Sequence, residues 1–147
     1  MMKRVYFLIL LILNGCGPEY DTKYYKAISP DKRQTALLKL EISKDFFHGD
    51  YQVIYDDKSK VDGKITGNVK GDTLTGNFRY LSRENARSIV PIVFLKTDKN
   101  LRLGTGEAGT YMGFKVYSRG SVSFNDSLFQ FQPIEIQELN SLKNLTK

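Results

Sequence analysis

The stretch that decides the fold spans residues 61–81 and has the sequence VDGKITGNVKGDTLTGNFRYL. It consists of two runs in which apolar residues or glycine alternate with polar residues, which is the period-two pattern of half-buried β-strands. The pair Gly71-Asp72 separates the two runs, and such a pair between alternating segments indicates a two-residue β-hairpin. The expected buried face of this hairpin carries Ile65, Gly67, Val69, Leu74, Gly76, Phe78 and Tyr80.

Four glycines are spaced through this stretch, at Gly63, Gly67, Gly71 and Gly76. Strands of a small closed sheet coil sharply, and glycine on the inner face permits the coiling. A phosphate-binding loop would require a helix N-terminus after the glycines, and no helical pattern follows them. The glycines therefore favour a strongly coiled sheet over a nucleotide site.

The alternation continues on both sides of this hairpin. Further strands are expected at residues 35–43, 51–55, 89–95 and 101–107. Within the apolar run IVPIVFL, Pro91 indicates a strand edge or a bulge, because proline donates no ladder hydrogen bond. The expected turns and uncertain segments are FFHGD at 46–50 as a turn, TYMGFKVY at 110–117 as a short strand or irregular connection, and a last hairpin made of residues 121–124 and 128–131.

The strand count is about eight or nine, at spacings of about 8 to 12 residues and without a convincing helix between them, which is typical of an antiparallel all-β domain. We predict a small antiparallel meander barrel of about eight strands, lipocalin-like, because closure removes exposed strand edges. The expected inward residues are Tyr51, Val53, Tyr55, Leu74, Phe78, Tyr80 and Phe94.

The first 16 residues, MMKRVYFLILLILNGC, have the order of a secretory signal, since Lys3 and Arg4 precede the apolar run VYFLILLIL. Nine apolar residues are too few for a membrane-spanning helix, which needs about 20. The last four residues resemble the bacterial lipobox, and this resemblance implies that Cys16 is diacylated and becomes the first residue of the mature protein. Plain secretion with an incidental cysteine is the alternative.

The expected organisation is a signal peptide at residues 1–15, a lipidated flexible tether at 16–34, the barrel at 35–133 and a polar tail at 134–147. For the tail, a frayed helix and the absence of structure both stay open. Cys16 is the one cysteine of the chain, so the stability of the domain must come from packing and backbone pairing, without disulfides.

The charge balance excludes one class of partner. Of 22 basic residues, Lys3 and Arg4 leave with the signal, so 20 remain against 16 acidic residues. The basic residues alternate with acidic ones and form no basic run. Nucleic-acid binding, which requires a clustered basic face, is therefore not expected.

The segments GDTLTGNFRY, IVFLK, LRLGTGE and SFNDSLFQF together resemble the skeleton of a group of small Bacteroidota lipoproteins of uncharacterised function. The resemblance covers roughly residues 63–131, and the lipobox adds to it. It implies a barrel-like lipoprotein and supplies no activity. The loop after the hairpin departs from the group, in which Ser-Glu-Gly is usual and an arginine often follows. Here it is Ser82-Arg83-Glu84-Asn85, with Val90 where the arginine would be.

Catalytic and metal-binding motifs are missing from the sequence. His48 is the one histidine and is expected in a turn, no nucleophile motif surrounds a serine, and Asp56, Asp57 and Asp62 lack calcium-loop spacing. No cofactor is expected. The polar residues with a potential role in ligand binding or ion pairing are Arg83, Glu84, Arg87, Arg102 and Glu107. The two glutamates could also form the acid pair of a glycan-acting hydrolase, although pairing with the arginines is the commoner arrangement.

These features favour a non-catalytic, membrane-anchored lipoprotein of the cell envelope. We expect palmitate-type acyl chains to hold it on the outer membrane. Two functions stay open. The barrel could be filled by its aromatic residues and act through its outer face on an envelope protein, or it could be hollow and bind a small apolar or anionic ligand.

Overall fold

The computed structural model describes residues 17, 19–82 and 84–145, which form ten β-strands and one α-helix. The elements in chain order are β1 (Asp21–Ile28), β2 (Gln34–Ile42), β3 (Phe46–Tyr55), β4 (Lys60–Lys70), β5 (Thr73–Leu81), β6 (Arg87–Thr97), β7 (Asn100–Leu103), β8 (Ala108–Tyr111), β9 (Phe114–Tyr117), β10 (Gln130–Ile134) and α1 (Ile136–Asn144).

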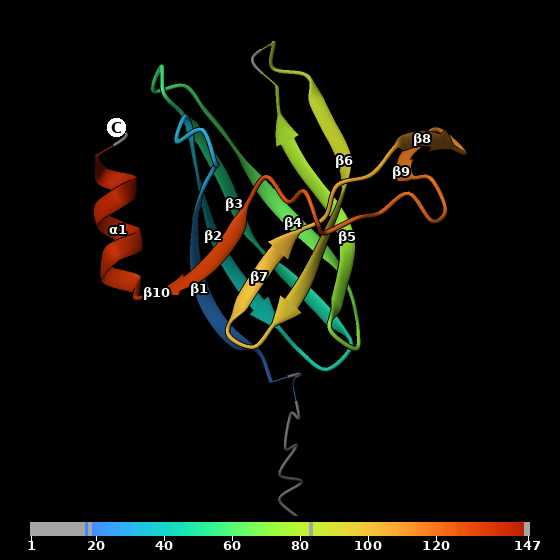
Figure 1. The fold of residues 1–147 in the computed structure, drawn as a ribbon, viewed down its shortest axis with the longest axis horizontal. Coiled ribbons are helices and arrows are strands. Elements are labelled where there is room, and N and C mark those ends of the chain that lie inside the picture. Colours follow the sequence, from blue (N-terminus) through green and yellow to red (C-terminus); the bar gives the residue numbers. More distant parts are fainter. Residues whose placement is uncertain (1–16, 18, 83, 146–147) are drawn as a thin grey trace, which may run out of the picture.

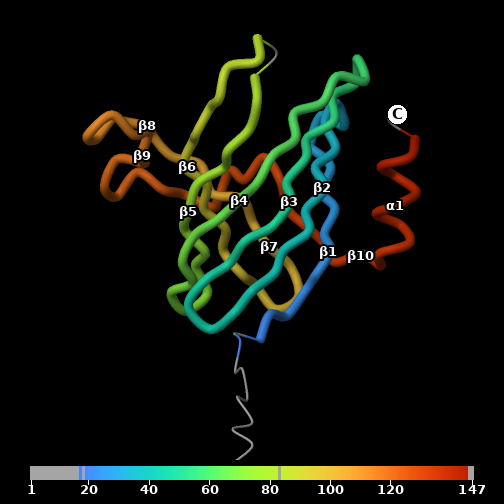
Figure 2. The backbone as a smooth tube through the Cα atoms, turned by 180° about the vertical axis from the view of Figure 1, so that it is seen from behind, coloured from blue at the N-terminus to red at the C-terminus, as the bar shows by residue number. Residues whose placement is uncertain are grey.

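Eight of these strands close into an antiparallel barrel in the order β1-β10-β7-β6-β5-β4-β3-β2 (Figure 1). Strands that follow one another in the sequence are neighbours in the barrel, and β10 closes it between β7 and β1. The predicted all-β meander barrel is therefore confirmed. Strands β8 and β9 form a separate hairpin, and Figure 2 shows it projecting from the side of the barrel opposite to α1.

The hairpin predicted at residues 61–81 is confirmed as β4 and β5. Lys70 pairs with Thr73, and Gly71 and Asp72 make the two-residue turn between them. Gly71 has a φ of 60°, a backbone conformation that glycine adopts at no steric cost. The sequence pattern and the turn chemistry thus specify the same register.

The interior of the barrel is filled by side chains. Tyr51 contacts Phe78 edge-on at a centroid distance of 5.0 Å, and Phe78 stacks on Tyr80 at 4.8 Å. Phe94 and Phe131 meet edge-on at 5.9 Å, and Phe131 also contacts Tyr51 at 6.2 Å. The predicted inward residues all belong to this core, with Tyr55 and Tyr80 partly buried at its border. The aromatic residues therefore pack against one another in the core of the barrel.

The N-terminal boundary predicted for the barrel is wrong. Strand β1 lies within the segment expected to be a tether, residues 16–34, and pairs with both β2 and β10. Its residues Tyr25 and Ala27 are buried in the core, while Tyr24 and Lys26 point outward. The barrel needs this strand because β10 and β2 would otherwise be two open edges.

The turn predicted at residues 46–50 is also wrong, since these residues form the first half of β3. Phe47 and Gly49 continue the inward alternation of Tyr51, which keeps the strand extended across the core. The turn lies earlier, where the Ser43 N–H donates to the Phe46 carbonyl at 2.8 Å and the Phe46 N–H donates to Ser43 Oγ at 3.2 Å.

The predicted last hairpin does not form. Ser123 makes only an isolated bridge to Thr105, and residues 128–131 do not pair with residues 121–124. Instead, β10 pairs with β7 through Phe131 and Leu101 and with β1 through Tyr24 and Ile134. Residues 130–134 pair with strands that are distant in the sequence, and not with residues 121–124, because the distant pairing closes the barrel.

Pro91 lies in a half of β6 that has one barrel neighbour. Strand β7 pairs with β6 only from Phe94 onward, so residues 87–92 pair with β5 alone. The Val93 carbonyl accepts from Gly104 N–H on the β7 side, so the alternation of the strand directs the backbone of Pro91 toward the same open edge. The missing N–H of proline blunts this edge, as the sequence predicts.

The predicted polar tail, residues 134–147, contains the last residue of β10 and the helix α1. Leu139 is the buried residue of this helix and lines the same hollow as Leu37, which is 1% exposed. Glu138 forms an ion pair with Lys26 on β1, with 3.3 Å between Oε1 and Nζ. A helix with one buried apolar side chain is attached to the barrel by a small contact.

Candidate functional site

The described members of the predicted polar cluster, Glu84, Arg87, Arg102 and Glu107, form no ion pairs with one another. Cys16 and Arg83 lie outside the described residues. Glu84 is exposed in the turn between β5 and β6, Arg87 is the first residue of β6, and Arg102 lies in the middle of β7. No ion pair between described residues joins Glu84 or Glu107 to Arg87 or Arg102.

Glu107 has a structural role through its backbone. Its N–H donates to Ser121 Oγ at 3.1 Å, and its carbonyl accepts from the Ser118 N–H at 2.7 Å. These bonds close the base of the β8–β9 hairpin. The carboxylate of Glu107 is exposed and takes no part in them.

The β8–β9 hairpin exposes apolar side chains at its tip. Tyr111 pairs with Phe114 across a two-residue turn of Met112 and Gly113, whose φ values are 49° and 83°. Tyr111 is 68% exposed, Met112 80% and Phe114 63%. A positive φ is uncommon for a residue with a side chain, and such residues cluster at functional sites. Exposed apolar side chains in a turn also raise the free energy of the protein in water unless a partner covers them.

A hollow of about 350 Å³ separates this hairpin from the extended arm made by β5 and β6. We call it the arm cleft. Its lining comprises Tyr80, Arg87, Ser88, Ile89, Val90, Gly113, Phe114 and Lys115. One wall comes from β5 and β6 and the other from the start of β9 and the turn before it, so segments that are separate in the sequence form it.

The cationic groups of the arm cleft lack acidic partners. Arg87 and Lys115 line it without an acidic residue, and neither is in an ion pair within the part of the chain that the structure describes. A second hollow, of about 460 Å³, shares Arg87 and Ile89 with the arm cleft and extends onto Arg79, Leu81 and the acidic Asp62. Arg79 faces Ile89 across the strands and Leu81 faces Arg87, so charged and apolar side chains lie next to each other on this face.

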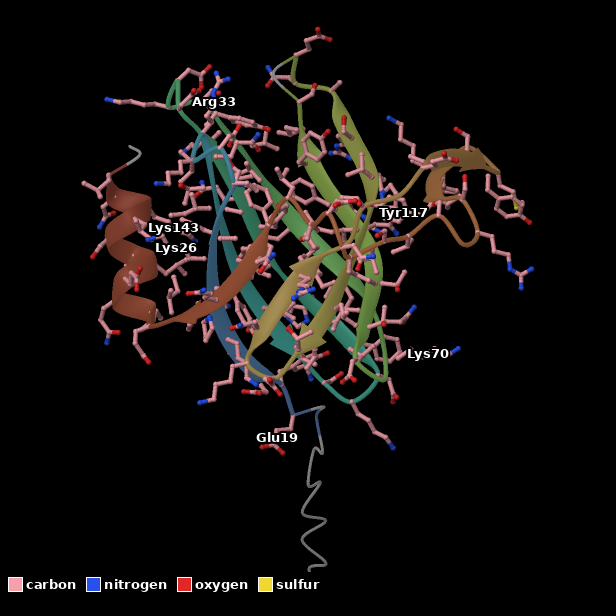
Figure 3. All side chains as sticks on the ribbon, in the orientation of Figure 1. Glu19, Lys26, Arg33, Lys70, Tyr117 and Lys143 are labelled. Carbon is pink, nitrogen blue, oxygen red and sulfur yellow. The ribbon has the colours of Figure 1, made fainter. Side chains whose placement is uncertain are left out.

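Tyr117 lies where the hairpin joins the barrel (Figure 3). Burial raises the pKa of its phenol above the ordinary value, and the pKa of Tyr51 in the core is raised for the same reason. The ring of Tyr117 fills the space beside Gly106, where an added Cβ would lie 2.9 Å from it. The base of the hairpin is thus fixed by packing, while its tip is exposed.

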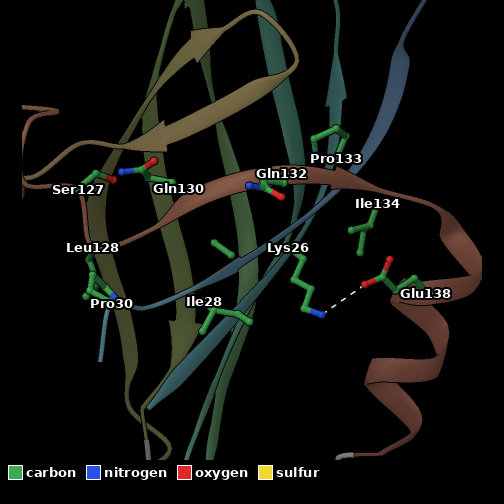
Figure 4. Close-up of a pocket in the computed structure, with 11 residues that line it drawn as sticks. Lys26, Ile28, Pro30, Ser127, Leu128, Gln130, Gln132, Pro133, Ile134 and Glu138 are labelled. Carbon is green, nitrogen blue, oxygen red and sulfur yellow. Dashed lines mark hydrogen bonds and ion pairs between the residues drawn. The ribbon is translucent and has the colours of Figure 1, made fainter. Parts of the chain in front are cut away.

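A different hollow, of about 600 Å³, lies outside the barrel between β1, β10 and α1 (Figure 4). Its lining is polar and includes Gln130, Gln132 and the ion pair between Lys26 and Glu138. Its charged groups already satisfy one another. It is therefore less suited to a charged partner than the arm cleft.

His48 is a strand residue and not the turn residue that the sequence predicts. Its Nε2 lies 3.0 Å from Glu41 Oε2 on the neighbouring strand, and its ring contacts Tyr20 edge-on at 4.7 Å. Within residues 17, 19–82 and 84–145, no three His, Cys, Asp or Glu side chains gather closely enough to hold a metal ion. Within the same described residues, no helix is long and apolar enough to cross a bilayer.

The sequence pattern does not predict a function for the hairpin tip. For residues 110–117 it leaves a short strand and an irregular connection open. A usable signal exists, because Met112-Gly113 stands between Tyr111 and Phe114 where turn chemistry favours Asn-Gly or Asp-Gly. Apolar residues at a predicted turn indicate a contact surface.

The comparison with protein-family models gives no match, and the comparisons with curated proteins and with solved structures give no significant match.

Proposed function

We propose that this protein is a lipid-anchored, non-catalytic interaction protein of the cell envelope that presents the β8–β9 hairpin to a partner protein. The observation that carries the proposal is the tip itself, with Tyr111, Met112 and Phe114 each more than half exposed. Aromatic residues and methionine are enriched at protein interfaces, and a few such side chains carry most of the binding free energy.

The filled interior supports this choice over the alternative of a small apolar ligand inside the barrel. Tyr51, Phe78, Phe94 and Phe131 contact one another across the core. A ligand of ordinary size would have to displace them. The outer surface is then the part of the domain that is available for recognition.

The position of the hairpin agrees with anchoring through Cys16. Cys16 precedes Asp21 by five residues, so the covalent chain between them spans at most roughly 18 Å. Glu19 lies at the lower end of the barrel in Figure 3, and the β8–β9 hairpin projects from its upper part. An anchor at the lower end would leave the hairpin, which projects sideways from the upper part of the barrel, at a distance from the acylated membrane.

Site-specific photo-crosslinking in intact cells tests the proposal. A photoreactive phenylalanine analogue at Met112 should give one discrete adduct, and the same analogue at Lys70, an exposed residue at the far end of the barrel, should give none. The change Phe114→Ser should abolish the adduct without altering thermal unfolding. Equal adducts at both positions, or none at Met112, would contradict an interaction role for the hairpin.

A further inference from the structure

We infer that the arm cleft binds an acidic segment of the partner polypeptide, in which carboxylates flank an aromatic or aliphatic side chain. This inference rests on the proposed interaction function and identifies the chemistry that the interaction surface recognises.

The shape of the arm cleft suits a polypeptide side chain. Its volume of about 350 Å³ lies at the small end of the range of about 300 to 1,000 Å³ for ligand sites. Phe114 and Ile89 supply apolar walls from β9 and β6, and Tyr80 contributes from β5. An aromatic or branched aliphatic side chain inserted between these walls would cover Phe114, which is 63% exposed in the free protein.

The charge of the arm cleft specifies the residues beside that side chain. Arg87 and Lys115 come from opposite walls, and no acidic residue lines the space between them. The adjoining hollow adds Arg79 and also the carboxylate of Asp62, and its Lys64 is paired with Asp50, so the unbalanced positive charge lies in the arm cleft itself. Guanidinium groups bind carboxylates through two parallel hydrogen bonds, so acidic residues on either side of the inserted side chain would have two cationic partners.

A concave site with two walls favours a peptide over a bilayer. An anionic membrane would meet the convex tip at Tyr111 and Met112, yet it could not enter the space between Arg87 and Lys115. The position of Glu19, at the end of the barrel away from the hairpin, points the same way (Figure 3). We therefore assign the site to a polypeptide and treat an anionic lipid surface as the competing outcome of the test.

Selection from a random octapeptide display library against the full-length chain in detergent tests this inference. We expect enriched peptides with at least two acidic residues around one aromatic or aliphatic residue. Synthetic copies of those peptides should bind at least tenfold more weakly to Arg87→Glu and Lys115→Glu. Lys70→Glu is the matched control, because Lys70 is also exposed and outside the cleft, and it should bind as the unchanged chain does.

The inference is wrong if the selection enriches no peptides, or only peptides without acidic residues. It is also wrong if the Arg87→Glu and Lys70→Glu variants bind the peptides equally well, or if the protein binds phosphatidylglycerol vesicles in a charge-dependent way and does not bind peptides. Arg87 and Lys115 are exposed, so their variants should fold, and circular dichroism checks this. If the Met112 adduct persists while acidic peptides fail, the interaction function stands and the partner chemistry is wrong. If the adduct is absent, the interaction function itself fails.

Discussion

Gly67 on β4 and Gly76 on β5 face each other across the hairpin with no side chain between them. A Cβ added to Gly76 would lie 2.7 Å from the Cα of Gly67, and one added to Gly67 would lie 2.7 Å from the ring of Phe47. The two glycines thus let the strands coil closely together and leave room for Phe47, which is 2% exposed.

Replacing Gly76 by valine should lower the free energy of unfolding by more than replacing Thr75 by valine. The Cβ of a residue at position 76 would lie 2.1 Å from the Thr66 carbonyl oxygen, so the backbone of β4 would have to shift, at a cost of at least about 1 to 3 kcal/mol. Thr75 is exposed on the other face of β5, so its change should cost little. Urea denaturation of both variants measures the difference, and a costlier Thr75 change would mean that the register of β5 is shifted by one residue.

Ionisation of Tyr51 should destabilise the protein at alkaline pH. Burial raises its pKa above that of a tyrosine in the unfolded chain, which is about 10, so the folded state holds the proton more tightly. The stabilisation is therefore complete below about pH 10 and is lost as the pH rises above it, by up to about 1.4 kcal/mol per pH unit for one group.

Tyr51→Phe should accordingly show a smaller loss of stability between pH 10 and about pH 12 than the unchanged chain. Tyr117→Phe should change the alkaline slope less, because Tyr117 is less buried than Tyr51. Denaturant titrations at several pH values decide the matter. Identical slopes for Tyr51→Phe and the unchanged chain would contradict the burial of this phenol.

Helix α1 should detach from the barrel more easily than the barrel unfolds. It docks through Leu139, which is 3% exposed. The hollow that Leu139 lines also contains Gln52, whose Oε1 is buried and has no hydrogen-bond partner among the described residues. That unsatisfied oxygen weakens the contact. Leu139→Ala should remove about 2 kcal/mol of local stability and speed amide exchange in α1, while amides of β4 keep their protection. Ile136→Ala, at an exposed position of the same helix, is the control and should leave exchange unchanged.

Cys16→Ser should release the protein from the membrane or leave it unprocessed. Acyl chains contribute about 0.8 kcal/mol per buried methylene, and we propose them as the anchor of this chain. Partitioning into detergent phase and metabolic labelling with palmitate compare the two forms. The lipobox interpretation fails if both forms partition and label alike.

The changes Glu84→Gln and Glu107→Gln should each alter the free energy of unfolding by no more than about 0.5 kcal/mol, as is usual for exposed positions. Neither carboxylate is in an ion pair with a described residue, and Glu107 supports the hairpin through its backbone alone. A deletion strain should be complemented by both variants. Loss of complementation by two folded, correctly localised variants would favour the glycan-acting hydrolase.

The local sequence specified those parts of the fold that depend on neighbours in the chain. Alternation identified β4, β5 and the inward residues of β3, and Gly71-Asp72 specified the turn, because both signals act over a few residues. Where the pairing partner lies far along the chain, the same signals failed. Strand β1 joins β10 through Tyr24 and Ile134, and no pattern within β1 reveals that distant partner.

The candidate site shows the same division. The sequence by itself indicated a role for Arg87 in ion pairing or ligand binding, because the chemistry of a guanidinium group does not depend on the fold. Only the tertiary structure decided its surroundings, by placing Phe114 and Lys115 of β9 opposite Arg87 and leaving Glu107 at the hairpin base. Phe114 and Lys115, which are 27 and 28 residues from Arg87 in the sequence, line the same hollow because β7 pairs with only part of β6 and the β8–β9 hairpin lies beside the rest. The pairing of the eight barrel strands, which no single stretch of sequence specifies, therefore determines which residues form the proposed interaction surface.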